Sequence, residues 1–467
     1  MLQKAFISLL LFLFTALPYL SAQSNSSTAT ELSLNQAVQY ALQNHVDVLN
    51  AKDDEIIAKK DVKEVIGIGL PQVKGAADLQ HFFEIPTQFL PDFVTPSVYD
   101  VLIDEGLLSN NNSGPSEVFP AQFGTPFTAS AGVEASQLLF DGSYLIGLKA
   151  TKTYQDVSKK TTEQVKIEKV INVSKAYYNV LVSEERMGII IANETRLKSL
   201  FDETKALYEN GFVEKLDVDR IELSYNDVVF EKEKVQNLLN LSLLVLKFEM
   251  GMNLKEEIQL TDKLSDIQFT PTLPVQDNFN YQNRVEYSIM ETQNRLLELE
   301  VKRNQVDYFP NLVAFGSYST NAQRNEFDIF EKGEWFPTGI VGARLQLNIF
   351  DGFQRNAKIQ KAKINHQKME RAFDLMENSI DLQIESARTN FENAVKSLQI
   401  QEKNKALAEE VVRVTKIKYE EGLGTNLEVT NAESSLKEAQ SNYYNALFDA
   451  IVAKLDYEQA TGSVVIP

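Results

Sequence analysis

Side chains that could support catalysis or bind a metal are scarce in this chain of 467 residues. Its three histidines, His45, His81 and His366, share no ligand spacing, and the sequence contains no cysteine. Disulfides, thiolate metal sites and a cysteine nucleophile are therefore excluded. No glycine-rich phosphate loop or nucleophile motif is present either. We expect a protein that is not an enzyme and that uses no cofactor and no metal.

Two carboxylates have a distinctive placement, because each follows one of two matching turns. Tyr208-Glu-Asn-Gly211 precedes Leu216-Asp217-Val218, and Tyr419-Glu-Glu-Gly422 precedes Leu427-Glu428-Val429. Glycine suits the left-handed conformation just past a helix end, so each carboxylate should lie near the start of the next helix. Thr425-x-x-Glu428 also has the spacing of a capping box, in which Glu428 closes the helix start.

The charge and the first residues indicate where the protein works. A net charge of −19 makes nucleic acid an unsuitable partner, since its phosphates would be repelled. Residues 1–22 have the features of a secretory signal, with Lys4, an apolar run and Leu20-Ser21-Ala22 as a cleavage site, so the mature chain should begin near Gln23. No later segment approaches the roughly 20 apolar residues of a membrane-spanning helix. Such a chain is either soluble or crosses an outer membrane as strands.

Apolar spacing predicts two very long helices and four two-faced strands. The proline-free stretches 143–210 and 353–421 repeat apolar residues every three or four positions, and the second would be roughly 100 Å long. Strict alternation predicts strands with one apolar and one polar face. These strands are expected at 72–82, 127–140, 309–320 and 335–350. Shorter helices are expected at 31–67, 214–250, 277–307 and 426–460, a long loop at 83–125, a loop at 321–334 and an irregular connector at 251–276.

The chain reads as two copies of one plan. Leu139-Phe140-Asp141-Gly142 matches Ile349-Phe350-Asp351-Gly352, and the two turns match in the same order. We therefore expect a first repeat at 23–250 and a second at 277–467. Each repeat consists of a short helix, a strand, a loop, a strand, a long helix, a turn and a short helix. The fold class is α+β.

Four strands are too few to close a barrel alone, because about eight is the smallest common number. Lipid does not tolerate open sheet edges, so several chains must share one sheet. Each strand pair is entered and left on the same side, which places the long helices at one end. The sequence thus predicts a membrane barrel extended by a helical tube.

The two-repeat plan, the paired Phe-Asp-Gly turns and the paired Tyr-x-x-Gly turns resemble the TolC-type outer-membrane efflux proteins, over nearly the whole mature chain. The resemblance implies a homotrimer with a shared 12-stranded barrel in outer-membrane lipid and a periplasmic helical tunnel, in a Gram-negative bacterium. It also implies an exit duct of a tripartite efflux pump or type I secretion system. An inner-membrane transporter would supply the energy and a periplasmic adaptor would dock on the helical tips.

The resemblance assigns a gate to the turns. Family members narrow the tunnel with acidic residues after the second turn, which gives the gate candidates Glu428, Asn431, Asp217 and Tyr419. A ring of three Glu428 side chains would favour cations. Capping remains the alternative for Glu428, and for Asp217 in the first copy. Gly424 stands where the family can have a tip arginine, and Arg220 is placed to pair with Asp217 or Glu428.

The resemblance also marks a docking edge for the adaptor and an interfacial belt. The docking edge would be formed by the turn residues Gly211, Phe212, Val213, Gly422, Leu423 and Gly424. Exposed Phe212 and Leu423 would support docking, whereas packing under their own helix ends is the alternative. Trp335 and Phe336 fit an aromatic belt where strands leave lipid, with a buried loop anchor as the alternative.

A soluble periplasmic coiled-coil adaptor or scaffold is the competing interpretation of the whole chain. It explains the long helices and the secretory signal, with the strands forming a small sandwich. It does not explain strands that alternate this regularly beside loops of very different length. An enzyme is the third possibility, and no residue pattern supports it.

Overall fold

The computed structural model describes residues 30–91, 94–109, 118–264, 279–329, 331 and 333–467. The predicted signal at 1–22 lies outside these residues. The chain divides into two compact units. The helical unit consists of the described residues of Met1–Asp53, Lys159–Ser288 and Leu375–Pro467, and the sheet unit of those of Asp54–Ser158 and Ile289–Asp374. This division by compactness runs across the two repeats that were predicted along the sequence.

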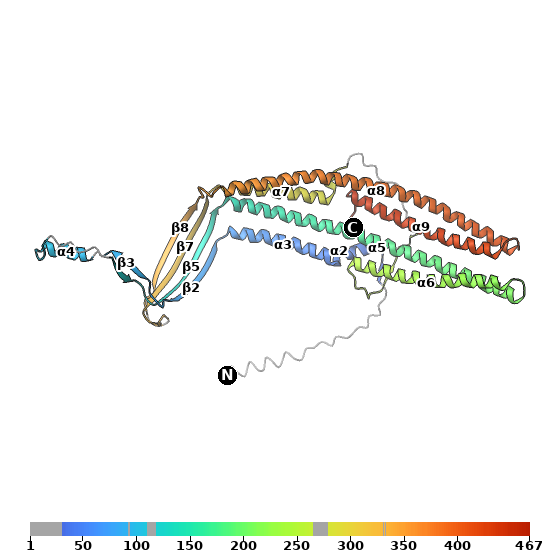
Figure 1. The fold of residues 1–467 in the computed structure, drawn as a ribbon, viewed down its shortest axis with the longest axis horizontal. Coiled ribbons are helices and arrows are strands. Elements are labelled where there is room, and N and C mark those ends of the chain that lie inside the picture. Colours follow the sequence, from blue (N-terminus) through green and yellow to red (C-terminus); the bar gives the residue numbers. More distant parts are fainter. Residues whose placement is uncertain (1–29, 92–93, 110–117, 265–278, 330, 332) are drawn as a thin grey trace, which may run out of the picture. The chain divides into compact units, whose positions relative to one another are not determined.

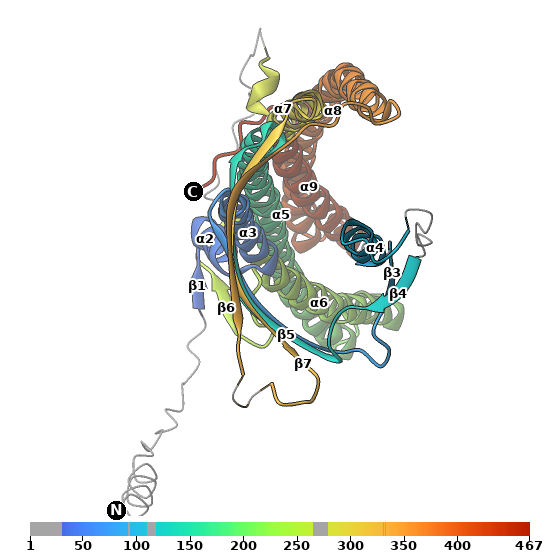
Figure 2. The same ribbon diagram turned by 90° about the vertical axis from the view of Figure 1, so that its left-hand side faces the viewer.

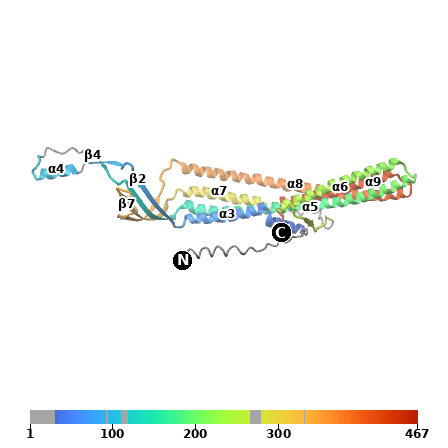
Figure 3. The ribbon, with the colours of Figure 1, turned by 90° about the horizontal axis from the view of Figure 1, so that it is seen from below.

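The long helices are α5 (Gly142–Glu209) and α8 (Gln354–Glu420), and each is followed by a shorter one, α6 (Lys215–Met250) and α9 (Asn426–Ala460). Their bounds differ from the predicted ranges by one residue at most. In Figures 1 and 3, α6 lies beside the C-terminal part of α5, and α9 beside that of α8. No helix in the described part of the chain is long and apolar enough to cross a membrane.

The expected single helix at 31–67 is wrong, because the chain forms β1 (Thr30–Leu32), α2 (Leu34–Asn44) and α3 (Val46–Ile68). Ser33 caps α2 in a capping box with Gln36. The break falls at His45, whose backbone is extended and whose Nδ1 accepts a hydrogen bond from the Asp47 N–H at 3.1 Å. Gly251 lies so close that a Cβ there would be 2.8 Å from the His45 Cα. The break is therefore fixed by a distant segment that local spacing does not reveal.

The connector after α6 is less irregular than predicted. It contains β6 (Ile258–Leu260), which pairs in parallel with β1. Asp262 then accepts hydrogen bonds from the Leu34 N–H at 2.8 Å and the Tyr177 hydroxyl at 2.9 Å. This corner joins the core of the helical unit, whose buried side chains come from α2, α5, α6 and α9. The connector residues 265–276 lie outside the described part of the chain.

The predicted helix at 277–307 is divided as well. A short 3₁₀ helix, η2 (Tyr281–Asn283), is followed by α7 (Val285–Val306), while residues 277–278 lie outside the described part. Arg284 sits between the two and is buried. Its guanidinium donates to the Ala460 carbonyl at 2.8 Å, so the residue that interrupts the helix also holds the end of α9 within the helical unit.

The sheet unit contains one antiparallel sheet of four strands in the order β2-β5-β7-β8, which Figure 1 shows side by side. The strands are β2 (Gln72–His81), β5 (Phe127–Phe140), β7 (Asn311–Arg324) and β8 (Phe336–Gln346). In Figure 2, which turns the view of Figure 1 by 90°, β5 and β7 follow a curved path. The predicted ranges were inaccurate in the second pair: β7 continues to Arg324 because its end pairs with the start of β5, and β8 ends at Gln346.

The register gives this sheet two chemically different faces, since directly paired residues point to the same side. The apolar face carries Val73, Gly75, Ala77 and Leu79; Ala129, Ala131, Val133 and Ala135; Leu312, Ala314, Gly316 and Tyr318; and Gly339, Val341, Ala343 and Leu345, with Gln137 and Thr320 as polar members. The polar face carries Lys74, Asp78, Ser130, Glu134, Ser317, Ser319, Thr338 and Arg344 among its members. Lys74 is paired directly with Glu134, which places opposite charges together.

The predicted long loop at 83–125 is wrong, because much of it is folded. Strands β3 (Thr87–Pro91) and β4 (Val118–Gln122) pair antiparallel, and α4 (Val94–Asp104) lies between them in the sequence. Proline is tolerated in these positions because a two-stranded ribbon consists of edge strands, and because the first turn of a helix needs no internal N–H bond. Residues 92–93 and 110–117 lie outside the described part.

Candidate functional site

The turn between α5 and α6 ends the long helix with a glycine in the left-handed region. Gly211 has φ 77°, and its N–H donates to the Tyr208 carbonyl at 2.9 Å. The next N–H, of Phe212, donates to the Leu207 carbonyl at 2.9 Å. This pair of bonds satisfies carbonyls that the helix end would otherwise leave unpaired.

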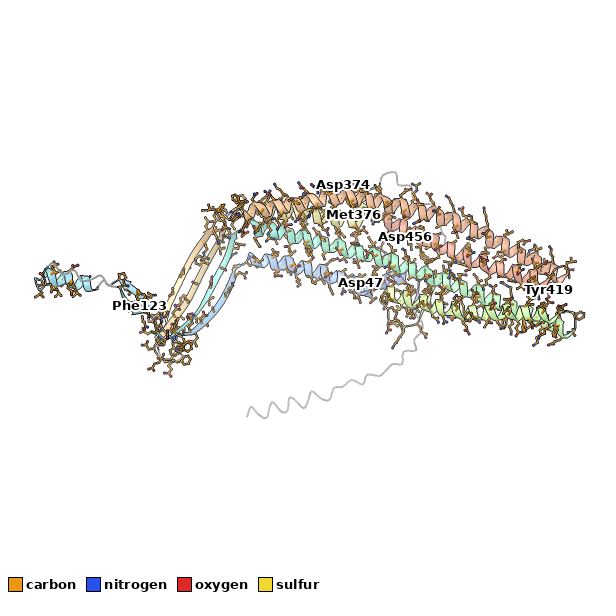
Figure 4. All side chains as sticks on the ribbon, in the orientation of Figure 1. Asp47, Phe123, Asp374, Met376, Tyr419 and Asp456 are labelled. Carbon is orange, nitrogen blue, oxygen red and sulfur yellow. The ribbon has the colours of Figure 1, made fainter. Side chains whose placement is uncertain are left out.

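The turn between α8 and α9 has the same bonds. Gly422 has φ 73° and donates to the Tyr419 carbonyl at 3.0 Å, and Leu423 donates to the Lys418 carbonyl at 2.8 Å. Figure 4 labels Tyr419 just before this turn, and both turns lie at the same end of the helical unit in Figures 1 and 3. The sequence match between the two turns therefore corresponds to matching backbone geometry.

Glu428 and Asp217 occupy the same position, the third residue of α9 and of α6, but they have different partners. Glu428 is exposed and completes a capping box: its Oε2 accepts from the Thr425 N–H at 3.4 Å, and the Thr425 hydroxyl accepts from its N–H at 3.3 Å. Helix α6 begins at Lys215, and its N-cap residue Glu214 makes no side-chain capping bond. There the half-buried Asp217 pairs with Arg220 at an N–O separation of 4.0 Å.

The capping role considered for Glu428 is thus present, and the partner of Arg220 is Asp217. A carboxylate that caps the first turn can still face a channel, because only one of its oxygens is engaged by the cap. Gly424 lies close to this cap, since a Cβ there would be 3.3 Å from the Glu428 Oε2. A larger side chain at 424 would therefore crowd the carboxylate.

Asn431 is exposed one turn further along α9, and Tyr419 is half-buried. Asn431 lines a pocket of about 260 Å³ between α5, α6 and α9, together with Asn193, Ser224, Asp227, Glu433 and Ser434. The four gate candidates therefore all lie in the helical unit: Tyr419 in the last turn of α8, and Asp217, Glu428 and Asn431 in the first two turns of α6 or α9. These positions are those in a single copy of the chain.

A buried ion cluster near this pocket was missed by the sequence analysis. Glu433 is only 7% exposed and pairs with Arg196 of α5 at 3.0 Å and with Lys416 of α8 at 3.7 Å. Arg196 also donates to the Asn193 side chain. The cluster thus links the α5–α6 hairpin to the α8–α9 hairpin within the helical unit. Its signal was a carboxylate on the apolar side of a helix, since Glu433 lies among the buried Val429, Ala432 and Leu436.

A second link between the hairpins lies farther along α9, where Lys437 pairs with Glu231 of α6. Elsewhere in the helical unit, Asp456 of α9 pairs with Lys175 of α5 at 2.5 Å and Asp47 of α3 with Lys169 of α5 at 3.1 Å (Figure 4 labels both acids). Charged side chains therefore connect the helices at several points along the helical unit.

The tips expose apolar side chains. Phe212 is 77% exposed and Leu423 is 82% exposed, so neither packs beneath its own helix end. Val213 is half-buried. Two large apolar residues at the same end of one unit form a surface that water does not favour.

Aromatic residues occur at both ends of the four-stranded sheet. At the start of β8, Trp335 is half-exposed and Phe336 is exposed, and at the same end the His81 ring stacks on Phe127 at 4.3 Å. The opposite end was missed by the sequence analysis. It carries the exposed residues Phe140, Tyr308, Phe309, Phe350 and Phe353. Their signal was the concentration of aromatic residues on both sides of the predicted strand ends.

Arg355 organises the passage from β8 to α8 within the sheet unit. It is buried, and its guanidinium donates to the Asp351 carboxylate at 2.7 Å, the Asn348 carbonyl at 2.7 Å and the Asp307 carbonyl at 3.2 Å. The guanidinium also lies over the Tyr308 ring, 4.3 Å from its centroid. These contacts tie the start of α8 to the end of α7.

The described residues contain no group of three or more histidine or acidic side chains placed to hold a metal ion. The arrangement around the turns consists instead of exposed carboxylates, exposed apolar tips and a buried ion cluster. Such an arrangement suits the passage or docking of other molecules.

Residues 289–463 match the family model described as outer membrane efflux protein. The chain is similar to the outer membrane protein TolC of Vibrio cholerae serotype O1, with 20% identity over 342 residues that cover 72% of this chain and 77% of the relative. Its fold is similar to that of the outer-membrane channel OprN, with a TM-score of 0.70, 16% identity and coverage of 93% and 91% of the two chains. It is also similar to the open state of the MtrE outer membrane channel of Neisseria gonorrhoeae, with a TM-score of 0.69, 17% identity and coverage of 92% and 88%.

Proposed function

The chain belongs to the TolC-like outer membrane efflux proteins, and we propose that three copies of it form the exit duct of a tripartite efflux pump or type I secretion system. Proteins of this family are transport channels rather than enzymes. They reside in the outer membrane, with their helical part in the periplasm. The duct is a passive conduit. An inner-membrane transporter supplies the energy, and a periplasmic adaptor opens the duct by docking.

The observation that carries the proposal is the two-faced sheet with its open edges. The apolar face presents small and aliphatic side chains on every strand, whereas the polar face holds paired charges such as Lys74 and Glu134. In a membrane barrel the apolar face contacts lipid and the polar face lines water. The aromatic residues at both ends of the strands suit the two interfaces between lipid and water.

The sheet edges explain why several copies are needed. Strands β2 and β8 are the outer strands of the four, so each has one side without a partner strand in the described chain. Lipid cannot satisfy those backbone groups. The β8 edge of one copy would pair with the β2 edge of the next, antiparallel, and three copies of the four-stranded sheet would supply the twelve strands of a closed barrel.

The turns provide the gate and the docking edge. Three copies of Glu428, together with Asp217, Asn431 and Tyr419 of each chain, would surround the narrow end of the tunnel and favour cations there. The exposed Phe212 and Leu423, with the neighbouring Gly211, Val213, Gly422 and Gly424, would give the adaptor an apolar surface to bury. Trp335 and Phe336 would anchor the barrel at one lipid interface.

Negative-stain microscopy of protein extracted from outer membranes in mild detergent tests this function. We expect a cylinder with threefold symmetry that is longer than one 68-residue helix, or about 100 Å. A thin rod recovered from the soluble periplasmic fraction would instead support the coiled-coil scaffold, and would contradict the duct.

A further inference from the structure

The described residues of the segment between β2 and β5, 82–91, 94–109 and 118–126, carry acids but no bases. We call this segment the acidic extension. Its described residues include no lysine, arginine or histidine, and their four acids are Glu84, Asp100, Asp104 and Glu105. Because β2 enters it and β5 leaves it, the extension lies at the end of the sheet away from α3 and α5. Figure 1 shows its elements β3 and α4 beyond that end of the strands.

The same segment exposes large apolar side chains. Phe83 is 92% exposed. At least half of the side-chain surface is also exposed at Phe89, Val98, Val101, Leu107 and Phe123. Figure 4 labels Phe123, which follows β4. Val98 and Val101 are three residues apart on α4 and therefore lie on one side of the helix. An amphipathic helix with an exposed apolar side usually has a partner to bury it against.

Helix α4 is a finished helix rather than a frayed loop. Gly106 follows it with φ 74°, and the N–H groups of Gly106 and Leu107 donate to the carbonyls of Ile103 and Leu102, each at 2.9 Å. This ending resembles those of α5 and α8. The exposed carboxylates Asp100 and Asp104 are thus held on the same short helix as the exposed valines, and the exposed Glu105 lies in the turn directly after it.

We propose that the acidic extension is a docking surface for a polypeptide partner that presents lysine or arginine beside apolar side chains, as a cationic amphipathic helix does. The four described acids, without a compensating base, repel an anionic lipid surface, and they repel a second copy of the same extension. A cationic amphipathic segment matches both properties, because its apolar side covers the valines and its basic residues pair with the carboxylates. This docking surface goes beyond the proposed duct, because the extension contains none of the gate or adaptor-docking residues.

The test uses the full chain in zwitterionic nanodiscs and a synthetic amphipathic helix of leucine and lysine as the probe. We expect saturable binding that weakens with added salt. The variant Asp100→Asn/Asp104→Asn/Glu105→Gln should bind about tenfold more weakly, as expected for three exposed ion pairs. The matched control Asp53→Asn/Asp54→Asn/Glu55→Gln neutralises three acids on α3 and should bind as the parent does.

Two further measurements separate the alternatives. Val98→Thr/Val101→Thr should also weaken binding of the probe, because the apolar side is part of the surface. A probe with glutamate in place of lysine should not bind. Equal binding of both probes, or an unchanged affinity in the triple amide variant, would overturn the proposal. Binding of the chain to phosphatidylglycerol or phosphatidylcholine vesicles that is lost in the valine variant would also overturn it. Self-association of the nanodiscs that is lost in the same variant would overturn it as well.

Discussion

Arg355 binds the Asp351 carboxylate twice, through its guanidinium Nε at 2.7 Å and through its own backbone N–H at 3.0 Å. The same carboxylate oxygen therefore caps the first turn of α8 and neutralises a buried cation. The remaining guanidinium nitrogens reach carbonyls at the ends of β8 and α7. Hydrogen bonding to Arg355 also lowers the pKa of Asp351 from its ordinary value.

We expect Arg355→Ala to destabilise the sheet unit by about 3 kcal/mol, because two carbonyls lose their donor and the Asp351 carboxylate keeps only the backbone N–H of residue 355. Chemical denaturation in detergent, followed by circular dichroism of the strands, measures this loss. Arg388→Ala removes an exposed ion pair with Glu392 and should cost less than about 0.5 kcal/mol. Equal effects of the two changes would show that Arg355 does not organise the junction.

His45 should make the helical unit sensitive to mild acid. Burial and, secondarily, Lys169 lower its pKa, against weaker opposing effects of Asp47 and Glu249. A depressed histidine pKa means that folding favours the neutral ring, so this contribution to stability is present above the ordinary value of about 6.5. It is lost as the pH falls from there through the folded pKa.

The apparent melting temperature should therefore decrease between pH 7.5 and 5.5. In His45→Asn, whose amide oxygen can still accept from the Asp47 N–H, the decrease should be smaller. The same decrease in the parent and the variant would assign the acid sensitivity to other groups.

Glu433 should be necessary for joining the two hairpins. Glu433→Ala leaves Arg196 and Lys416 without the buried carboxylate, and we expect a loss of about 3 kcal/mol in the free energy of unfolding. Glu438→Ala, at an exposed position on the same helix, should change it by less than about 0.5 kcal/mol. Thermal and denaturant unfolding of the helical signal would compare them. An unchanged free energy of unfolding in Glu433→Ala would mean that the ion pairs of the cluster only offset the cost of desolvating their charges.

The gate and capping roles of Glu428 can be separated by two substitutions. Glu428→Gln keeps an oxygen acceptor for the Thr425 N–H but removes the charge, so it should reduce cation selectivity with little change in stability. Thr425→Ala removes the cap, at a cost of about 1 kcal/mol, and should leave selectivity intact. Reversal potentials across planar bilayers in a salt gradient measure the selectivity. Unchanged selectivity in Glu428→Gln would remove Glu428 from the gate.

Periodic patterns made much of the architecture predictable. Alternation placed all four main strands, and apolar spacing placed α5, α6, α8 and α9, because each pattern reflects a face that must be buried or wetted along the whole element. The capping box at Thr425 was confirmed because both of its partners are local in the sequence. Local signals therefore sufficed where the controlling contacts are local.

Contacts between distant segments account for what was missed. The break at His45 depends on Gly251, and the three-residue β1 depends on β6, so neither produces a pattern of its own. Glu433 finds Arg196 on the other hairpin, and a single acid in an apolar stripe does not identify its partner. Residues 83–125 were wrongly predicted to form a loop, because the prolines there occupy positions that strands and helix starts accept.

The central claim is that β2 of one copy pairs with β8 of another, and cysteine cross-linking tests it on a background without native cysteines. Ala76→Cys would be combined in turn with Thr338→Cys, Ile340→Cys or Arg344→Cys. Within one sheet, β2 and β8 are three strand spacings apart, or about 14 Å, which is beyond the reach of a disulfide. Any cross-link between them must therefore join two copies.

As the control, Ala76→Cys would be combined with Ser317→Cys, on the interior strand β7 and the same polar face. The account predicts that at least one β2–β8 pair yields covalent species of up to three copies and no larger, while the control pair yields none. Absence of cross-links at every β8 position, or a ladder that continues beyond three copies, would contradict the closed three-copy barrel.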